Sequence, residues 1–279
     1  MAIPILTFDI ELDKLVPSTY DSETSWELPS KPKITCAATC EMVTGRTKTY
    51  WTPSTDGKRL AAKVMSKELI HELVDDLYSF ICRGGMIVSW GGTAVDFRAL
   101  HACSEDINRK QMCIFMARTQ IDIPFASSSE VGFMFSLNSA AKGMGLVGKD
   151  SSISFNAPQL WDTGRELEVL HQVQGDAILT AAVYFRTMNN PSLNWITQRG
   201  KTKTWKPYII QVPMGGGYVC PRMQTVEECM NRPKAFVPFV TPHGLDRDYA
   251  IKWIDKFSTF SHFQGAGIGG TAANSNSNQ

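Results

Sequence analysis

The sequence predicts an α/β domain built on a mixed β-sheet, and the order of its first elements supports this class. Residues 3–12 combine β-forming and apolar side chains in a loose alternation, which is typical of a first strand. Two more strands are expected around Lys33–Met42 and Arg46–Trp51, joined by a tight connection at Gly45. A helix, a strand and a second helix follow them. Three strands before alternating helices and strands suit a mixed sheet.

Helical periodicity is clearest over Ser66–Ile81, where apolar residues recur every three or four positions. Ser66 suits the N-cap, and Gly84 and Gly85 end the pattern. A buried strand is expected at Met86–Trp90 because this run is short and apolar. Further helices are expected at Asp96–Ala102, Ser136–Gly143 and Ala177–Met188.

The chain is expected to divide into three parts. Residues 1–190 form the α/β domain, because Asn189, Asn190 and Pro191 interrupt the helical pattern there. Residues 191–263 are less periodic and form a C-terminal extension that packs on the core or on substrate. Residues 264–279 consist of small and polar residues without charge and are predicted to be disordered.

Composition fits a soluble globular protein, with 43% hydrophobic and 20% charged residues among 279. The net charge of +1 excludes a strong overall positive field, so any nucleic-acid binding must come from local patches. No segment has the roughly 20 consecutive apolar residues that span a bilayer. The acidic start resembles no secretion signal, and seven scattered cysteines favour a reducing compartment, so we expect a cytoplasmic protein.

Two carboxylates stand on the first predicted strand. Asp9 and Glu11 are two positions apart and therefore point to the same face, whereas Phe8, Ile10 and Leu12 point to the other. Like charges this close repel each other, and a divalent cation would remove that cost. A solvated strand face, or pairing with Lys or Arg, is the structural alternative.

Three more polar residues occur at positions typical of a site. Asp96 follows a buried strand and a Gly-Gly turn, although an acid there also suits a helix N-terminus. Asp176 precedes the apolar helix, and the structural alternative to a site role is that it is the N-cap of this helix. Because Gly175 suggests that the helix begins near Asp176, we expect His171 on a preceding segment from which it can reach the same site.

Taken together, Asp9-x-Glu11, Asp96 and His171-x4-Asp176-Ala177 resemble the DEDDh family of 3′→5′ exonucleases. This family has the ribonuclease-H-like fold and includes proofreading exonucleases. The resemblance covers roughly residues 1–188, including the stretches IDIPF and SLNSAAKGMGL. It implies a ribonuclease-H-like mixed sheet flanked by helices and a metal-dependent hydrolysis of DNA or RNA that releases nucleoside monophosphates.

The resemblance also implies a role for each site residue. Asp9, Glu11 and Asp176 would bind one Mg²⁺ or Mn²⁺ ion. Asp9 would bridge to a second ion, which Asp96 would bind directly or through water. His171 would act as general base, since imidazole suits proton transfer near neutral pH. Two positions depart from patterns of related enzymes: Leu12 stands where many members have threonine, and Gln172 stands where the tyrosine subtype has its tyrosine.

A basic segment in the extension is the second candidate region. Arg199, Lys201, Lys203 and Lys206 could contact the phosphates of a nucleic acid with a free 3′ end, more readily a single strand. The interleaved tryptophans, Trp195 and Trp205, could stack on bases. The structural alternative is a solvated hairpin whose tryptophans pack on the core.

Other polar groups are weaker candidates. Asp122 in IDIPF could contact substrate. The spacing of Cys220, Cys229, His243 and His262 matches no common zinc signature. Gly215–Gly217 lacks the context of a phosphate loop. The remaining groups have structural readings: Cys36 and Cys40 as buried thiols on one strand face, and Asp162, Glu166 and Glu168 as a polar helical face.

Two other functions remain open at this stage. The domain could be a nucleic-acid-binding or scaffold module of the same fold with little or no catalysis. The retention of mutually repelling carboxylates argues against this reading. It could also be a two-metal nuclease that cuts internally at particular nucleic-acid structures.

Overall fold

A five-stranded mixed sheet forms the centre of the molecule, in the order β3-β2-β1-β4-β5. The computed structural model describes residues 3–16, 26–149, 151–214, 216–232 and 247–258. The central strand β1 is antiparallel to β2 and parallel to β4. The strands are β1 (Ile5–Leu12), β2 (Ile34–Glu41), β3 (Thr47–Tyr50), β4 (Met86–Ser89) and β5 (Ile121–Asp122). The order is consistent with a ribonuclease-H-like fold, and the predicted fold class is confirmed.

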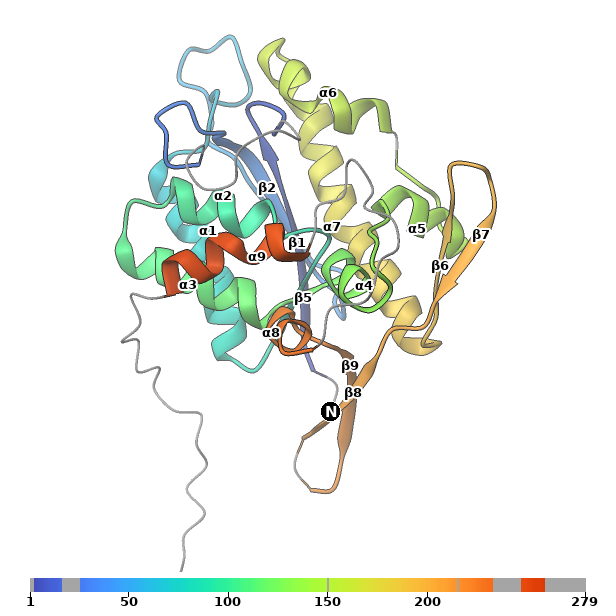
Figure 1. Cartoon of the computed structure of the whole chain (residues 1–279). Helices are drawn as coiled ribbons and strands as arrows, with labels where there is room; N and C mark the ends of the chain where they lie inside the picture. Colours follow the sequence, from blue (N-terminus) through green and yellow to red (C-terminus); the bar gives the residue numbers. More distant parts are fainter. Residues whose placement is uncertain (1–2, 17–25, 150, 215, 233–246, 259–279) are drawn as a thin grey trace, which may run out of the picture.

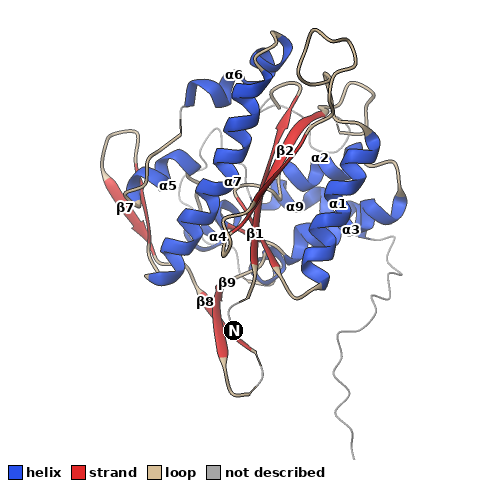
Figure 2. Ribbon diagram, turned by 180° about the vertical axis from the view of Figure 1, so that it is seen from behind, coloured by secondary structure: helices blue, strands red, loops and turns tan. Residues whose placement is uncertain are grey.

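Helices cover both faces of this sheet (Figures 1 and 2). Phe8, Ile10 and Leu12 of β1 pack in one cluster with α1 (Lys67–Cys82), α2 (Asp96–Cys103), α3 (Ile107–Thr119) and α9 (Arg247–Ser258). Cys36, Ala38 and Cys40 of β2 pack on the other side with α6 (Ser151–Asp162) and α7 (Glu166–Asn189). The sheet is buried on both faces because alternate side chains of each strand serve opposite layers.

The first helix follows the sequence pattern closely. In α1, Ile70, Leu73, Val74 and Leu77 are buried, and the hydroxyl of Ser66 accepts a hydrogen bond from the backbone N–H of Leu69 at 3.3 Å. The helix therefore has the cap and the apolar stripe that the sequence predicts.

The helix α7 differs from the expectation. It runs without interruption over 24 residues from Glu166 to Asn189, so the prediction that it begins near Asp176 is wrong. A glycine inside a helix costs only about 1 kcal/mol. Burial of Val169, Leu170 and Val173 against β2 outweighs the cost of Gly175.

The segment after Asn189 forms two hairpins and a short helix before α9. They comprise β6 (Leu193–Ile196) with β7 (Thr202–Trp205), β8 (Ile209–Pro213) with β9 (Val219–Met223), and α8 (Val226–Met230). In Figure 1 both hairpins project from the body. Their inner residues share a cluster with Ile3, Ile5 and Val88, together with α4 (Ile123–Val131) and α5 (Leu137–Gly143). The extension is thus packed on the core, and residues 264–279 lie outside the described part.

Among the helices of the described residues, none combines the length and apolar character needed to cross a membrane.

Candidate metal centre

The strand β1 presents two carboxylates to the helix α7. Its odd-numbered residues face this helix, as shown by the hydroxyl of Thr7, which donates to the carbonyl of Ala177 at 2.7 Å. Asp9 and Glu11 follow on the same face and are only partly exposed, while their even-numbered neighbours enter the opposite cluster. The alternation of a strand therefore directs both acids toward one helix.

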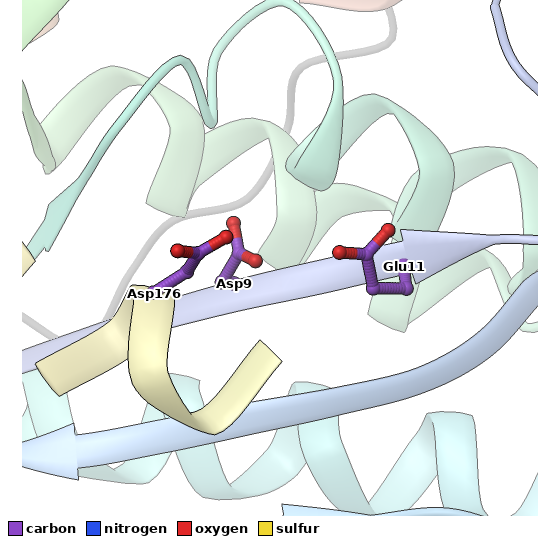
Figure 3. A group of neighbouring side chains, drawn as sticks. All are labelled: Asp9, Glu11 and Asp176. Atoms are coloured by element: carbon purple, nitrogen blue, oxygen red, sulfur yellow. The ribbon is translucent and has the colours of Figure 1, made fainter. Parts of the chain in front are cut away.

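Asp176 of α7 completes a group of three carboxylates. One oxygen from each of Asp9, Glu11 and Asp176 lies within 4.8 Å of the others (Figure 3). Asp176 is buried, with 3% of its surface exposed. Its Oδ1 atom has no hydrogen-bond partner among the described residues. A buried carboxylate oxygen without a partner is costly, so this oxygen is suited to a cation.

The other oxygen of Asp176 is held by two donors. Oδ2 accepts from Nζ of Lys149 at 2.6 Å and from Nε2 of Gln172 at 2.7 Å. The side chain of Lys149 is partly exposed, and it forms the ion pair that compensates part of the negative charge. These contacts hold one oxygen of the carboxylate and leave Oδ1 without a partner among the described residues.

The electrostatics of the group follow from crowding. Burial, followed by repulsion from Asp176, raises the pKa of Asp9 to about 7, although Lys149 acts in the opposite direction. Burial and then the charges of Asp9 and Asp176 raise the pKa of Glu11 well above its usual range. Three crowded carboxylates with one unpartnered oxygen offer the hard oxygen ligands that Mg²⁺ and Mn²⁺ prefer, so the residues fit a divalent cation.

Asp96 lies near this group without being part of the group of three. It is the first residue of α2, at the carboxyl end of β4, and 5% of its surface is exposed. Burial, then Asp9, Asp122 and Glu11, raise its pKa well above the usual range. Asp96 is therefore electrostatically coupled to both acids of β1.

Asp122 has a different role from the substrate contact that the sequence suggested. Only 2% of its surface is exposed, and its carboxylate accepts hydrogen bonds from the backbone N–H groups of Gly91, Thr93 and Phe125. It caps α4 and holds the turn before α2. Asp122 thus belongs to the scaffold of the site.

His171 does not join the acids in the way the sequence predicted. Because α7 is continuous, five residues separate His171 from Asp176 by about 140° around the helix axis. His171 is exposed, whereas Gln172, four residues before Asp176, is buried and bonds to it. The prediction that His171 lies on a separate segment is wrong, because packing of α7 on β2 keeps the helix intact.

The sequence reasoning missed the positions of Lys149 and Gln172 in the site. The i, i+4 spacing of Gln172 and Asp176 was a usable signal, because such pairs meet on one helix face. Lys149 carries no local signal. It precedes α6 in the chain and reaches Asp176 only through the tertiary fold.

The basic segment has the structure expected of the alternative reading, a solvated hairpin whose tryptophans pack on the core. Arg199, Lys201 and Lys203 are exposed on the β6–β7 hairpin and line one shallow hollow. Trp205 is 3% exposed, and its indole N–H donates to Glu130 at 2.9 Å. Trp195 is 9% exposed and stacks on Phe135 with ring centroids 4.9 Å apart. Both tryptophans are core residues, so the prediction that they stack on bases is wrong.

Some of the remaining sequence hypotheses concern residues that the structure describes. Glu166 is buried and pairs with Arg59 at 2.6 Å, so it is no solvated helix face. Cys36 and Cys40 are buried thiols in one cluster, as predicted. His243, His262 and Gly215 lie outside the described residues.

No protein-family model and no curated protein matches the chain. Similar solved structures include the family B DNA polymerase from the hyperthermophilic archaeon Pyrobaculum calidifontis. The identity is 13%, with 67% of this chain and 25% of that chain covered and a TM-score of 0.43. A product-bound exonuclease I is 11% identical, with 92% and 71% covered and a TM-score of 0.30. The chain spans about a quarter of the polymerase, and the chemistry of the site rests on its own residues.

Proposed function

We propose that this protein is a metal-dependent 3′→5′ exonuclease that hydrolyses phosphodiester bonds of DNA or RNA and releases nucleoside monophosphates. The observation that carries the proposal is the convergence of Asp9, Glu11 and Asp176 on one point, with Oδ1 of Asp176 buried and without a partner in the described residues. The motif resemblance described above supplies the direction of cleavage and the products.

Asp9, Glu11 and Asp176 would hold one divalent cation, and Asp9 together with Asp96 would hold a second. When bound, two such ions activate a water and stabilise charge on the phosphate and on the leaving oxygen. Lys149 and Gln172 hold Oδ2 of Asp176 and thereby orient its other oxygen toward the cation. Mg²⁺ and Mn²⁺ are the candidate ions because all four protein ligands are carboxylates.

For the general base, the motif resemblance and the geometry of α7 favour different assignments. The motif resemblance gives this role to His171, whereas the continuous helix places Gln172, and not His171, on the face of Asp176. An amide cannot accept the proton of a water at neutral pH. The helix geometry therefore favours transfer of the proton to bulk solvent, and the activity of His171→Ala tests this assignment.

The exposed cations of the β6–β7 hairpin are the proposed contact for the substrate strand. Arg199, Lys201 and Lys203 are the cations that line its hollow. Because they would contact phosphates and not bases, we expect binding that depends on salt and little on sequence.

This contact predicts the effect of charge reversal. Lys201→Glu/Lys203→Glu should weaken the affinity for a fluorescent single strand and flatten its salt dependence. Lys58→Glu/Arg83→Glu, at exposed positions outside the hairpin, makes the same change in net charge and should have a smaller effect. Equal losses in the two double variants, measured by anisotropy, would argue against a hairpin contact.

A strand labelled at its 5′ end separates the proposal from its rivals. In the presence of Mg²⁺ or Mn²⁺, a 3′→5′ exonuclease shortens it one nucleotide at a time, and nucleoside monophosphates accumulate. A structure-specific endonuclease gives a few discrete internal cuts. A binding module retains the strand and releases no product, which would contradict the proposal.

A further inference from the structure

A short turn connects β4 to the helix that begins with Asp96. Gly91 has a φ of +86°, a backbone conformation that favours glycine. A Cβ atom at Gly92 would lie 2.5 Å from Oγ of Ser89, so this residue also requires glycine. The N-cap of α2 is Val95, whose side chain cannot accept a capping hydrogen bond. The placement of Asp96 therefore depends on how the turn itself is held.

Thr93 makes three of the contacts that hold the turn, beside the backbone N–H groups of Gly91 and Gly92, which donate to Asp122 and Ser89. Its backbone N–H donates to Asp122 at 2.9 Å, and its hydroxyl accepts from the amide of Gln120 at 3.1 Å. Its carbonyl accepts from the indole N–H of Trp253 at 2.9 Å. Thr93 and Gln120 are fully buried, and Asp122 and Trp253 are each 2% exposed. Hydrogen bonds between buried groups hold a fixed geometry, although Oε1 of Gln120 has no hydrogen-bond partner among the described residues.

The third of these contacts comes from far along the chain. Trp253 lies in α9, 160 residues after Thr93. It packs with Ile254 in the cluster that contains Phe8, Ile10 and Leu12 of β1. Consequently α9 belongs to the cluster behind the strand that carries Asp9 and Glu11, and it also contacts the turn that precedes Asp96.

We infer that Trp253 of α9 is a positioning residue for Asp96, and that with Asp122 and Gln120 it forms the supporting shell of the second cation site. This inference rests on the proposed function, since it takes Asp96 as a ligand of that ion. The partners that orient a metal ligand are commonly worth a factor of about 10 to 100 in metal affinity. Trp253 acts here through the backbone of Thr93 and touches no ligand itself.

Titration of the purified full chain with Mn²⁺, followed by electron paramagnetic resonance, tests the inference without measuring catalysis. Trp253→Phe keeps an aromatic ring in the cluster but removes the N–H donor together with part of the ring volume. Trp161→Phe is the matched control, because Trp161 is equally buried and donates to the carbonyls of Ala62 and Lys63. Asp96→Asn removes a proposed ligand of the second ion, so its Mn²⁺ titration curve serves as the reference for loss of the second site.

The expected result is two Mn²⁺ ions bound by the wild type and by Trp161→Phe. Trp253→Phe should retain the first affinity and lose about 10-fold at the second. Identical second-site affinities in Trp253→Phe and the wild type would overturn the inference and leave the proposed function standing. An equal loss of second-site affinity in Trp161→Phe would show that general destabilisation causes the loss, and it would also overturn the inference. A wild type that binds no Mn²⁺ would contradict the proposed function itself, and the inference with it.

Discussion

At the scale of single residues, the group formed by Asp9, Glu11 and Asp176 brings together negative charges that repel one another. Three carboxylates converge, and the pKa of Asp9 rises to about 7 because burial and Asp176 oppose its ionisation. Lys149 relieves part of the repulsion. A divalent cation would relieve the rest, so stability and metal binding should be linked at this site.

This linkage predicts the thermal behaviour of Asp9→Asn. In EDTA at pH 8, the variant should unfold at a higher temperature than the wild type, because it removes one of the repelling charges. Addition of Mn²⁺ should raise the melting temperature of the wild type and have little effect on the variant. A wild type that gains no stability from Mn²⁺, measured by differential scanning fluorimetry, would contradict the linkage.

The two neighbouring side chains of α7 give a second prediction at this scale. Gln172→Leu removes the amide that donates to Asp176, so we expect the rate of hydrolysis to fall by about 10-fold or more. His171→Ala alters an exposed side chain on a different face, and most of the activity should remain. Loss of all activity in His171→Ala, with a normal circular dichroism spectrum, would instead establish His171 as the base.

A buried histidine on the other side of the sheet predicts an acid sensitivity. Burial, aided by the charges of Lys110, Arg98 and Lys31, lowers the pKa of His101 to about 3 from the usual 6.5. Below pH 6.5, His101 becomes protonated in the unfolded chain but stays neutral in the folded protein until the pH approaches 3. The contribution of His101 to stability is therefore complete above pH 6.5 and is lost as the pH falls toward 3, by up to about 1.4 kcal/mol per pH unit.

Denaturation of the wild type and His101→Gln by urea at pH 7 and pH 4.5 checks this point. The free energy of unfolding of the wild type should fall more steeply between these two pH values than that of the variant. Parallel slopes would show that His101 is protonated in the folded protein.

At the scale of elements, close packing of backbone segments holds the extension on the domain. The helix α5 meets β6 at Gly143, where a Cβ atom would lie 2.4 Å from the carbonyl oxygen of Asn194 and from Cα of Trp195. Both neighbours are backbone atoms, so they cannot swing aside. Gly175, in contrast, has open space around its Cα within α7.

The two glycines therefore predict opposite effects of the same substitution. Gly143→Ala should destabilise the protein by about 1–3 kcal/mol through overpacking. Gly175→Ala should stabilise it by roughly 0.5–1 kcal/mol, because alanine has the higher helix propensity. Urea denaturation curves measure both. Destabilisation by Gly175→Ala would contradict the continuous helix α7.

The strand β1 and the helices α1 and α7 show which parts of the structure can be predicted from the sequence. The strand β1 and the helix α1 were predictable because one periodic pattern sets each of them. The first half of α7 was not, since a local glycine signal competes there with burial against β2, which only the fold supplies. Trp195 and Trp205 were ambiguous for a similar reason: an aromatic next to lysines can face either solvent or core, and here both pack in the core.

At the scale of the whole molecule, the candidate site lies where distant segments meet. Asp9 and Glu11 come from one strand and were predictable as a pair from its alternation. Asp176 comes 165 residues after Glu11, and its contacts with Lys149 and Gln172 exist only in the folded chain. The sequence pattern could therefore name the acids and, through the i, i+4 spacing, Gln172, but not Lys149 or the connection through Trp253.

The central claim is that these acids bind divalent cations for hydrolysis of a nucleic acid from its 3′ end. The most direct measurement is the digestion of 5′-labelled single-stranded DNA and RNA by the wild type and by Asp176→Asn, with Mn²⁺ or with EDTA. We expect progressive shortening only by the wild type with Mn²⁺. No shortening of either strand by the wild type, or equal shortening by Asp176→Asn, would contradict the claim.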